Sequence, residues 1–114
     1  MSNKYKLLLS LNDVAQVLPL KIVSFSDGSS PLPDLSDENA ERLALENPRM
    51  RCVRGWLIIG TCIFRKHTVV ADEDGRLYEI TPQADALPFA SHYPRIGVYD
   101  RMPEELFLLE PNEN

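Results

Sequence analysis

The chain has no long hydrophobic run. No apolar stretch approaches the roughly 20 residues that a membrane-spanning helix needs. The first residues, MSNKYKLLLSLNDVAQVLPL, place lysines before an apolar stretch, which is the order found in secretory signal peptides. Asn12, Asp13 and Gln16 interrupt that stretch, however, and no small-residue cleavage site follows it. We therefore expect a cytoplasmic protein that does not enter the membrane.

Cysteine and the common ligand motifs are also scarce. Two cysteines, Cys52 and Cys62, are too few to imply a disulfide framework, and we expect both to be reduced and partly buried. A metal site drawn from these two with His67 and His92 matches no common zinc spacing. There is no phosphate-binding glycine loop, and the acidic run at 72–74 lacks the length and ligand spacing of a calcium loop. We expect neither a metal nor another cofactor.

An excess of basic charge is missing as well. The formal net charge is −5, whereas a non-specific nucleic-acid binder needs a basic patch to neutralise phosphates. We therefore expect no nucleic-acid partner, and the charge allows a positively charged partner without demanding one. The 114 residues, of which 44% are hydrophobic and 25% charged, are typical of one globular domain covering residues 1–114. Nothing in the sequence indicates an oligomeric state.

The order of elements predicts an α+β fold. Residues 36–47 make the clearest helix, because Ser36 is a good N-cap, Asp37 and Glu38 suit the helix dipole, and apolar residues recur at helical spacing. Residues 26–35, with a glycine and two prolines, predict a loop. The remaining expectations are a helix at 10–18 capped by Ser10, strands at 21–25, 52–60 and 96–99, a strand or helical turn at 104–109, and a frayed end at 111–114.

Residues 67–82, HTVVADEDGRLYEITP, predict a β-hairpin with Asp74-Gly75 in the turn. A three-residue loop at 73–75, with Gly75 in the left-handed conformation, would place Asp72 opposite Arg76 and Val69 opposite Glu79. His67 and Glu79 would then be diagonal neighbours on one face, within side-chain reach. A loop one residue shorter or longer would put them on opposite faces. The predicted contact between these two side chains therefore depends on the register.

These residues resemble a known family. The segments SDENA, ALENP, GW, HTVV and DGRLYEITP are similar to those of small bacterial proteins with the papain-like or NlpC/P60-like cysteine hydrolase fold, over about residues 34–82. The resemblance implies N-terminal helices packed on a small antiparallel sheet, as in a papain-like or NlpC/P60-like core. It places the nucleophile at Ser36, the histidine at His67 and the orienting acid at Glu79. The chain departs from the pattern at Ser36, where the family has cysteine.

That departure bears directly on activity. A helix N-terminus lowers the pKa of a thiol, but a serine hydroxyl is far harder to ionise and needs an oxyanion hole and a closely placed base. Ser36 also has an adequate structural role as an N-cap, and His67 and Glu79 could each be structural. Cys62 stands five residues before His67, on the opposite face of a continuous strand, and Cys52 follows the end of the helix, so neither replaces the nucleophile.

Two functions remain open. We favour a non-catalytic, degenerate papain-like protein of bacterial or phage origin that binds a protein or peptide partner, because no thiol occupies the position of the nucleophile. The alternative is a small hydrolase or acyl-transfer enzyme acting on an amide or ester. In that enzyme Ser36 would attack, His67 would be the base, and Glu79 would orient the imidazole.

Overall fold

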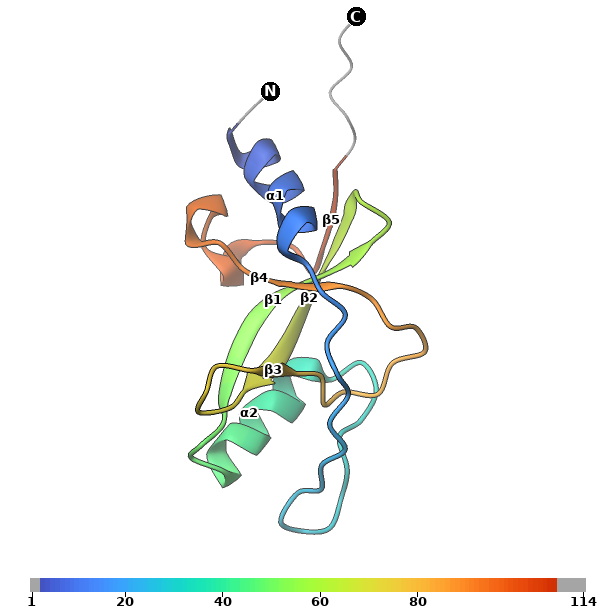
Figure 1. Cartoon of the computed structure of the whole chain (residues 1–114), viewed down its shortest axis with the longest axis vertical. Coiled ribbons are helices and arrows are strands. Elements are labelled where there is room, and N and C mark those ends of the chain that lie inside the picture. The colour runs from blue at the N-terminus through green and yellow to red at the C-terminus, as the bar shows by residue number, and fades with distance from the viewer. Residues whose placement is uncertain (1–2, 109–114) are drawn as a thin grey trace, which may run out of the picture.

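Two helices and an antiparallel sheet make up the fold, which confirms the α+β prediction (Figure 1). The computed structural model describes residues 3–108. The helices are α1 (Asn3–Val14) and α2 (Ser36–Glu46), and two short 3₁₀ helices are η1 (Pro94–Ile96) and η2 (Tyr99–Arg101). The strands are β1 (Arg51–Ile59), β2 (Ile63–Ala71), β3 (Leu77–Tyr78), β4 (Phe89–Ser91) and β5 (Glu105–Phe107). No helix in this described part is long and apolar enough to cross a membrane.

The long β1–β2 hairpin is the centre of the sheet. The two strands pair from Arg51↔Ala71 to Ile59↔Ile63, and the strand order is β3-β2-β1-β4. The outer edge of β2 has two partners: β5 pairs with residues 63–65 and β3 with residues 70–71. Residues 66–69 of β2 therefore lie between the two short strands, and this gap becomes part of the candidate site.

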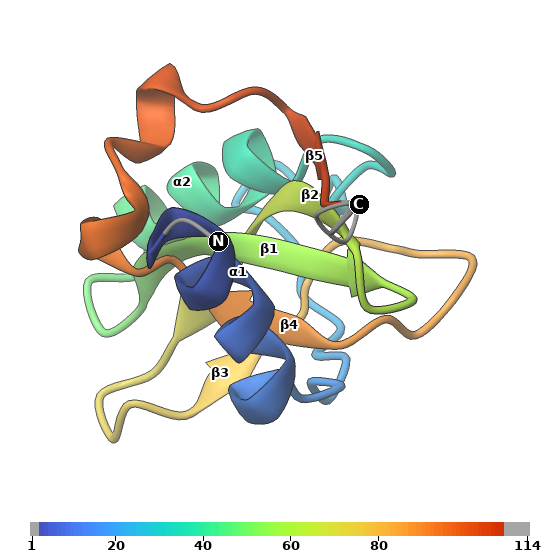
Figure 2. The ribbon, with the colours of Figure 1, turned by 90° about the horizontal axis from the view of Figure 1, so that it is seen from above.

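Both helices pack on the same face of this hairpin. Side chains alternate between faces along a strand, so Trp56, Ile58, Phe64 and Val70 share one face. The first three form a core with Leu8 and Leu11 of α1, and Val70 forms a second core with Ala40 and Leu43 of α2. Figure 1 shows the two helices toward opposite ends of the hairpin, and in Figure 2, which looks down on the molecule from the α1 end, α1 lies in front. On the other face, which carries His67, no helix from residues 3–108 contributes to the core; there Leu18 and Leu87 pack against Leu57, Val69 and Phe89.

The segment that follows α1, which we call the strap (residues 15–23), covers part of that second face. Gln16 exchanges two backbone hydrogen bonds with Phe89 of β4, at 2.8 and 2.9 Å. Farther along, the Lys21 N–H donates to the Glu79 carbonyl and the Glu79 N–H donates to the Pro19 carbonyl. Figure 1 shows this segment, in blue, crossing in front of the strands. The strap thus joins the edge of β4 to the chain that continues β3.

Several element predictions are confirmed and others are wrong. The helix at 36–47, the loop at 26–35 and the strand at 52–60 are present within one residue of their expected ends. Within the segment expected at 104–109, strand β5 covers Glu105–Phe107, and residue 109 lies outside the described residues. The helix expected at 10–18 instead spans Asn3–Val14, and the Ser10 hydroxyl donates to the Leu7 carbonyl within it. The frayed end expected at 111–114 lies outside the described residues.

Tertiary contacts explain the errors. The helix ends at Val14 because the backbone of Gln16 forms hydrogen bonds with Phe89 of β4 and so cannot continue the helix. Residues 21–25 form no strand, although Leu20, just before them, makes an isolated bridge to Glu79. In place of a strand at 96–99, two 3₁₀ turns flank Gly97, whose φ of 147° few other residues adopt.

Candidate functional site

The β2–β3 hairpin has the predicted register. Val70 pairs with Tyr78 and Ala71 with Leu77, and the Asp72 N–H donates to the Arg76 carbonyl at 3.0 Å. Gly75 has the expected positive φ, 82°. This register extends to Val69 opposite Glu79, as the three-residue loop requires. The Asp-Gly turn therefore places His67 and Glu79 on one face of the hairpin.

His67 and Glu79 form a close pair in a mostly buried position. The distance from His67 Nε2 to Glu79 Oε2 is 2.6 Å, and the two side chains are 7% and 12% exposed. At this distance the nitrogen and the oxygen share a proton, since two unprotonated atoms would repel each other. The strap fixes the backbone of Glu79 through the bonds from Lys21 and to Pro19. Sequence reasoning predicted this contact, and the role of the pair in catalysis stays a prediction.

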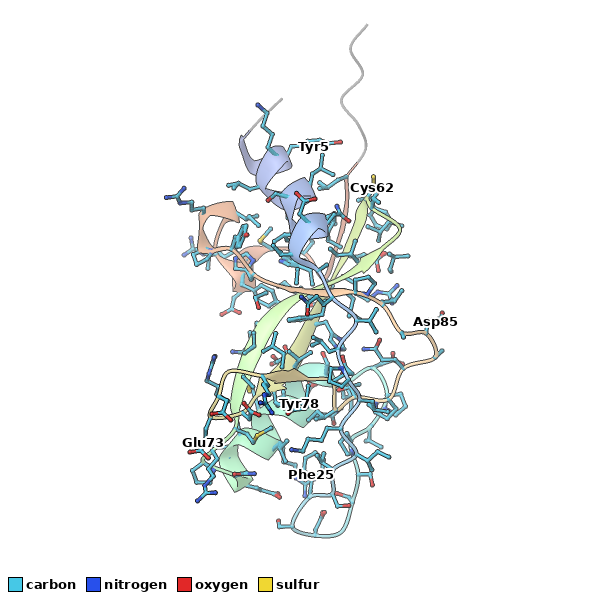
Figure 3. The ribbon with its side chains drawn as sticks, in the orientation of Figure 1. Tyr5, Phe25, Cys62, Glu73, Tyr78 and Asp85 are labelled. Carbon is cyan, nitrogen blue, oxygen red and sulfur yellow. The ribbon has the colours of Figure 1, made fainter. Side chains whose placement is uncertain are left out.

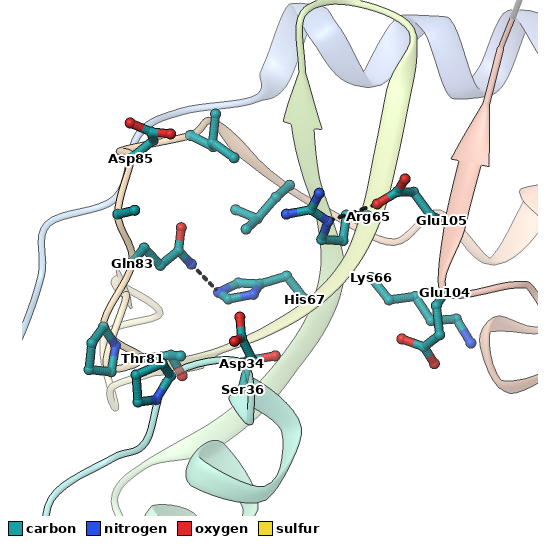
Figure 4. Close-up of a pocket in the computed structure, with 15 residues that line it drawn as sticks. Asp34, Ser36, Arg65, Lys66, His67, Thr81, Gln83, Asp85, Glu104 and Glu105 are labelled. Carbon is teal, nitrogen blue, oxygen red and sulfur yellow. Dashed lines mark hydrogen bonds and ion pairs between the residues drawn. The ribbon is translucent and has the colours of Figure 1, made fainter.

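Two further groups bind the Glu79 carboxylate. Its Oε1 accepts the Thr81 N–H at 2.9 Å, and its Oε2 lies 3.2 Å from Gln83 Nε2. Gln83 Nε2 is also 2.9 Å from His67 Nε2, the contact drawn in Figure 4. Because His67 Nε2 already shares its proton with Glu79, the Gln83 amide donates to the carboxylate, and its approach to the ring is a close contact only. Sequence reasoning missed Thr81 and Gln83, although both follow Glu79 closely in the chain.

The other ring nitrogen of His67 is available to a ligand. Within residues 3–108, Nδ1 makes no hydrogen bond, and it is not enclosed by protein atoms. Asp34 and Ser36 lie on the side of the ring away from Gln83 (Figure 4). The ring is therefore held at one nitrogen by Glu79 and presents the other to the cleft described below.

Gly55 makes room for the packing behind His67. It is the β1 residue opposite His67, and an added Cβ would lie 2.1 Å from the Ala90 carbonyl oxygen and 2.6 Å from Phe89 Cζ. The Phe89 ring occupies this space and meets the imidazole edge to face, with centroids 6.3 Å apart. A glycine opposite the histidine therefore lets an aromatic ring from β4 support the imidazole.

Ser36 does not cap α2, contrary to the prediction. The N-cap residue is Leu35, which makes no side-chain cap bond, and Ser36 is the first residue of the helix. The Ser36 Oγ instead accepts the backbone N–H of Thr68 at 3.1 Å. Thr68 lies in the part of β2 between β5 and β3, so the hydroxyl satisfies an amide that no neighbouring strand pairs. Among the described residues, no hydrogen bond joins Ser36 to His67.

Ser36 and His67 nevertheless line one cleft of about 570 Å³. Thr81 and Gln83 form its second wall, and Pro33 and Asp34 bring the end of the 26–35 loop to its rim without closing it. Asp34 has a φ of 63°, the only positive φ of a non-glycine residue in the described part of the chain. Aspartate tolerates this conformation better than most residues, and strained backbone is concentrated at binding sites. The structure thus brings two of the three predicted residues to an open cleft, with Glu79 behind the imidazole.

Asn39 joins the two walls of the cleft. It is 5% exposed, its Nδ2 donates to the Leu32 carbonyl and to Thr81 Oγ1, both at 2.9 Å, and its Oδ1 accepts the Leu32 N–H. Leu32 belongs to the loop that leads to Ser36, and Thr81 binds Glu79. Sequence reasoning missed this role. The available signal was the position of a polar residue four before Leu43, on the buried face of α2.

Asp37 anchors the first turn of α2 to the sheet. Its Oδ1 accepts from Arg54 Nε at 2.9 Å and from Thr68 Oγ1 at 2.8 Å. Partial burial acts to raise the pKa of Asp37, but the hydrogen bonds from Arg54 and Thr68 outweigh it, and the pKa lies below its ordinary value. The carboxylate therefore stays ionised beside the cleft and holds the start of the helix against β2.

The cysteines and His92 lie outside this arrangement. Burial raises the pKa of the Cys52 thiol, which disfavours a thiolate, and Cys62 lies at the far turn of the β1–β2 hairpin (Figure 3). Both nitrogens of His92 have partners, because Nδ1 accepts from Trp56 Nε1 and Nε2 donates to the Gly97 carbonyl. In residues 3–108 no group of three or more His, Cys, Asp or Glu side chains could hold a metal ion.

Comparison with known protein families, with curated proteins and with solved structures found nothing that matches this chain.

Proposed function

We propose that the chain is a non-catalytic relative of the papain-like or NlpC/P60-like cysteine hydrolases and that its cleft binds a segment of a protein or a peptide. The proposal rests on the resemblance of residues 34–82 to that family and on the cleft of about 570 Å³ between α2 and residues 81–85. The cleft is open and lined by mixed polar and apolar side chains, as binding sites for extended ligands are.

One observation favours binding over catalysis. The Ser36 Oγ accepts the Thr68 N–H, and this bond places the hydroxyl in the gap in the sheet edge. An accepted hydrogen bond draws electron density from the oxygen and lowers its nucleophilicity, while the base that would have to take its proton is not bonded to it. The hydrogen bond to Thr68 is therefore a sufficient structural reason for a serine at position 36, and no catalytic role is needed to explain it.

The second candidate is a hydrolase or acyl-transfer enzyme acting on an amide or ester. The specific observation in its favour is the 2.6 Å contact between His67 Nε2 and Glu79 Oε2, which leaves Nδ1 as the free nitrogen. In that reaction Ser36 would attack the carbonyl carbon, His67 Nδ1 would take the hydroxyl proton, and Glu79 would stabilise the imidazolium. The Ser36 hydroxyl proton is not committed to Thr68, since the hydroxyl accepts that bond.

Active-site labelling separates the two candidates. A fluorophosphonate probe should leave the wild-type chain unlabelled. Labelling that is lost in both Ser36→Ala and His67→Ala would overturn the non-catalytic proposal and establish the enzyme. Mass mapping of a Ser36→Cys variant treated with iodoacetamide at neutral pH adds a test of ancestry. Fast alkylation at position 36 supports inheritance of the site, and an inert thiol there contradicts it.

Binding is tested with an arrayed library of acetylated heptapeptides and the full chain. We expect a subset of the peptides to bind, and we expect Ala84→Trp to abolish their binding, because Ala84 is exposed and lines the cleft. The matched control is Ser30→Trp, which adds the same side chain at an exposed position outside the cleft. Equal binding by the two variants, or no binding by the wild type, would contradict the proposal.

A further inference from the structure

An apolar groove continues the cleft on the side of the strap. Its volume is about 130 Å³, close to the roughly 150 Å³ of an engineered cavity that accepts benzene. Its apolar lining comes from the strap residues Val17, Leu18 and Leu20 on one side and from Leu87 and Phe89 on the other. The groove therefore has the size and the lining to accept one aliphatic or aromatic side chain.

The groove and the cleft form one surface. Thr81, Gln83, Asp85 and Leu87 line both of them. The strap residues Val17 and Leu20 are 55% and 61% exposed, so nothing in residues 3–108 covers this side of the groove. Because the two hollows share the segment 81–87 as a wall, a ligand bound in the cleft lies beside the groove, and one of its side chains can reach over this segment to enter between the strap and residues 85–87.

The charge at the same surface is negative on balance, because four carboxylates line the cleft against two cations, Arg65 and Lys66. In the cleft, Arg65 is paired with Glu105 at 2.9 Å, and the Lys66 ammonium lies over the Tyr99 ring. Asp34, Asp85 and Glu104 line the cleft and make no ion pair with any residue from 3 to 108. Asp85 stands at the outer end of the loop beside the groove (Figure 3). A cationic group next to the apolar side chain complements this charge.

His67 offers a hydrogen-bonding atom to the same ligand. Its side chain is only 7% exposed, and among residues 3–108 no group forms a hydrogen bond with Nδ1, which faces the cleft. Because Nδ1 is open to the cleft, a peptide N–H bound there can donate to it in place of water. The imidazole can present Nδ1 as an acceptor when Nε2 carries the shared proton.

We propose that the groove is the specificity subsite of this cleft and that its ligand is an extended peptide segment with a large apolar residue next to a lysine or arginine. The apolar side chain enters between Leu20 and Leu87, and the cationic side chain faces Asp85. This inference rests on the proposed peptide-binding function and adds the chemical class of the ligand.

The heptapeptide array tests the inference with the full chain. Bound peptides should be enriched in Leu, Ile, Met or Phe next to Lys or Arg. For a peptide selected in this way, Leu20→Asp should weaken binding at least tenfold, measured by fluorescence polarisation. The matched control is Leu45→Asp, because Leu45 is 86% exposed on α2 and lines neither cleft nor groove. Circular dichroism of both variants checks that the fold is kept.

A charge substitution tests the second half of the inference. Asp85→Lys should weaken the cationic peptide at least threefold, with a smaller loss at high salt, because exposed charges are screened. Asp74→Lys, at the exposed tip of the β2–β3 hairpin, controls for the change in net charge. Peptides that bind without apolar or cationic preference, equally to wild type and Leu20→Asp, overturn the inference and leave the peptide-binding function intact. Absence of any binding overturns both.

Discussion

Replacing Gly55 with alanine tests the packing that supports His67. The added methyl group would lie 2.1 Å from the Ala90 carbonyl oxygen and within 2.9 Å of two carbons of the Phe89 ring. The ring can rotate, but the carbonyl belongs to the backbone of β4, which pairs with β1 at this point. The variant can fold only if β4 moves away from β1, and that movement withdraws the Phe89 ring from the imidazole.

The expected cost follows from this geometry. Overpacking a core costs about 1–3 kcal/mol and occasionally more. Contact with a backbone oxygen cannot be relieved by a rotamer change, so we expect a loss of about 3 kcal/mol or more in the free energy of unfolding. A domain of this size has a total stability of about 5–15 kcal/mol. Since 1 kcal/mol shifts the melting temperature by about 3–6 °C at this length, a loss of 3 kcal/mol corresponds to about 9–18 °C.

Urea denaturation followed by the fluorescence of the single tryptophan, Trp56, measures the free energy directly. The matched control is Gly60→Ala, because Gly60 has a φ of 64° and no atom within 4 Å of an added Cβ. That variant carries only the left-handed conformational cost of about 1–2 kcal/mol. If Gly55→Ala proves no more destabilising than Gly60→Ala, the account of β4 packing behind His67 is refuted.

Substitutions at three further residues test the site. Glu79→Ala should lower the free energy of unfolding by about 2–4 kcal/mol in urea denaturation, because it leaves His67 buried without its partner. Glu79→Gln should lower it less, because the glutamine side chain still accepts a hydrogen bond from His67. Equal losses in the two variants would contradict the shared proton. Asn39→Ala should cost about 2–3 kcal/mol in the same assay, since the groups that it bonds lose partners, and a loss below about 1 kcal/mol would argue against its joining the two walls. Asp37 stabilises the fold at pH values above its unfolded pKa of about 3.9, and this contribution should disappear as the pH falls through the lower pKa that Asp37 has in the folded protein. We therefore expect Asp37→Asn to lose less stability than wild type between pH 7 and pH 3 in urea denaturation. An equal loss would contradict the effect of Arg54 on the pKa of Asp37.

The pair at the centre of the site was predictable because its geometry is local. The Asp-Gly turn sets a three-residue loop, the loop sets the register, and the period of two along a strand then puts His67 and Glu79 on one face. Each of these steps lies within residues 67–82. The helix Ser36–Glu46 was predictable for the same reason, since its stripe of apolar residues and its acidic first turn lie within one segment.

The role of Ser36 could not be predicted in this way. Its partner, the Thr68 amide, is free only because β3 and β5 pair with the two ends of β2 and leave the middle open. That arrangement depends on the pairing of strands that are far apart in the sequence. Without knowledge of this pairing, a serine at the start of a helix predicts an N-cap. Asn39 was missed for a similar reason, because its partner Thr81 lies 42 residues later in the chain, and Gln83 was missed because its contact with Glu79 depends on how the chain turns after Thr81.

The strap has a consequence for how the protein forms. Gln16 binds Phe89 and Leu20 bridges Glu79, so a segment near the start of the chain needs partners that the ribosome makes 73 and 59 residues later. Closing such long loops is slow, and it follows the formation of the local hairpins. The β1–β2–β3 unit should therefore acquire protection from hydrogen exchange first, while the wall of the apolar groove is completed only in the last step of folding.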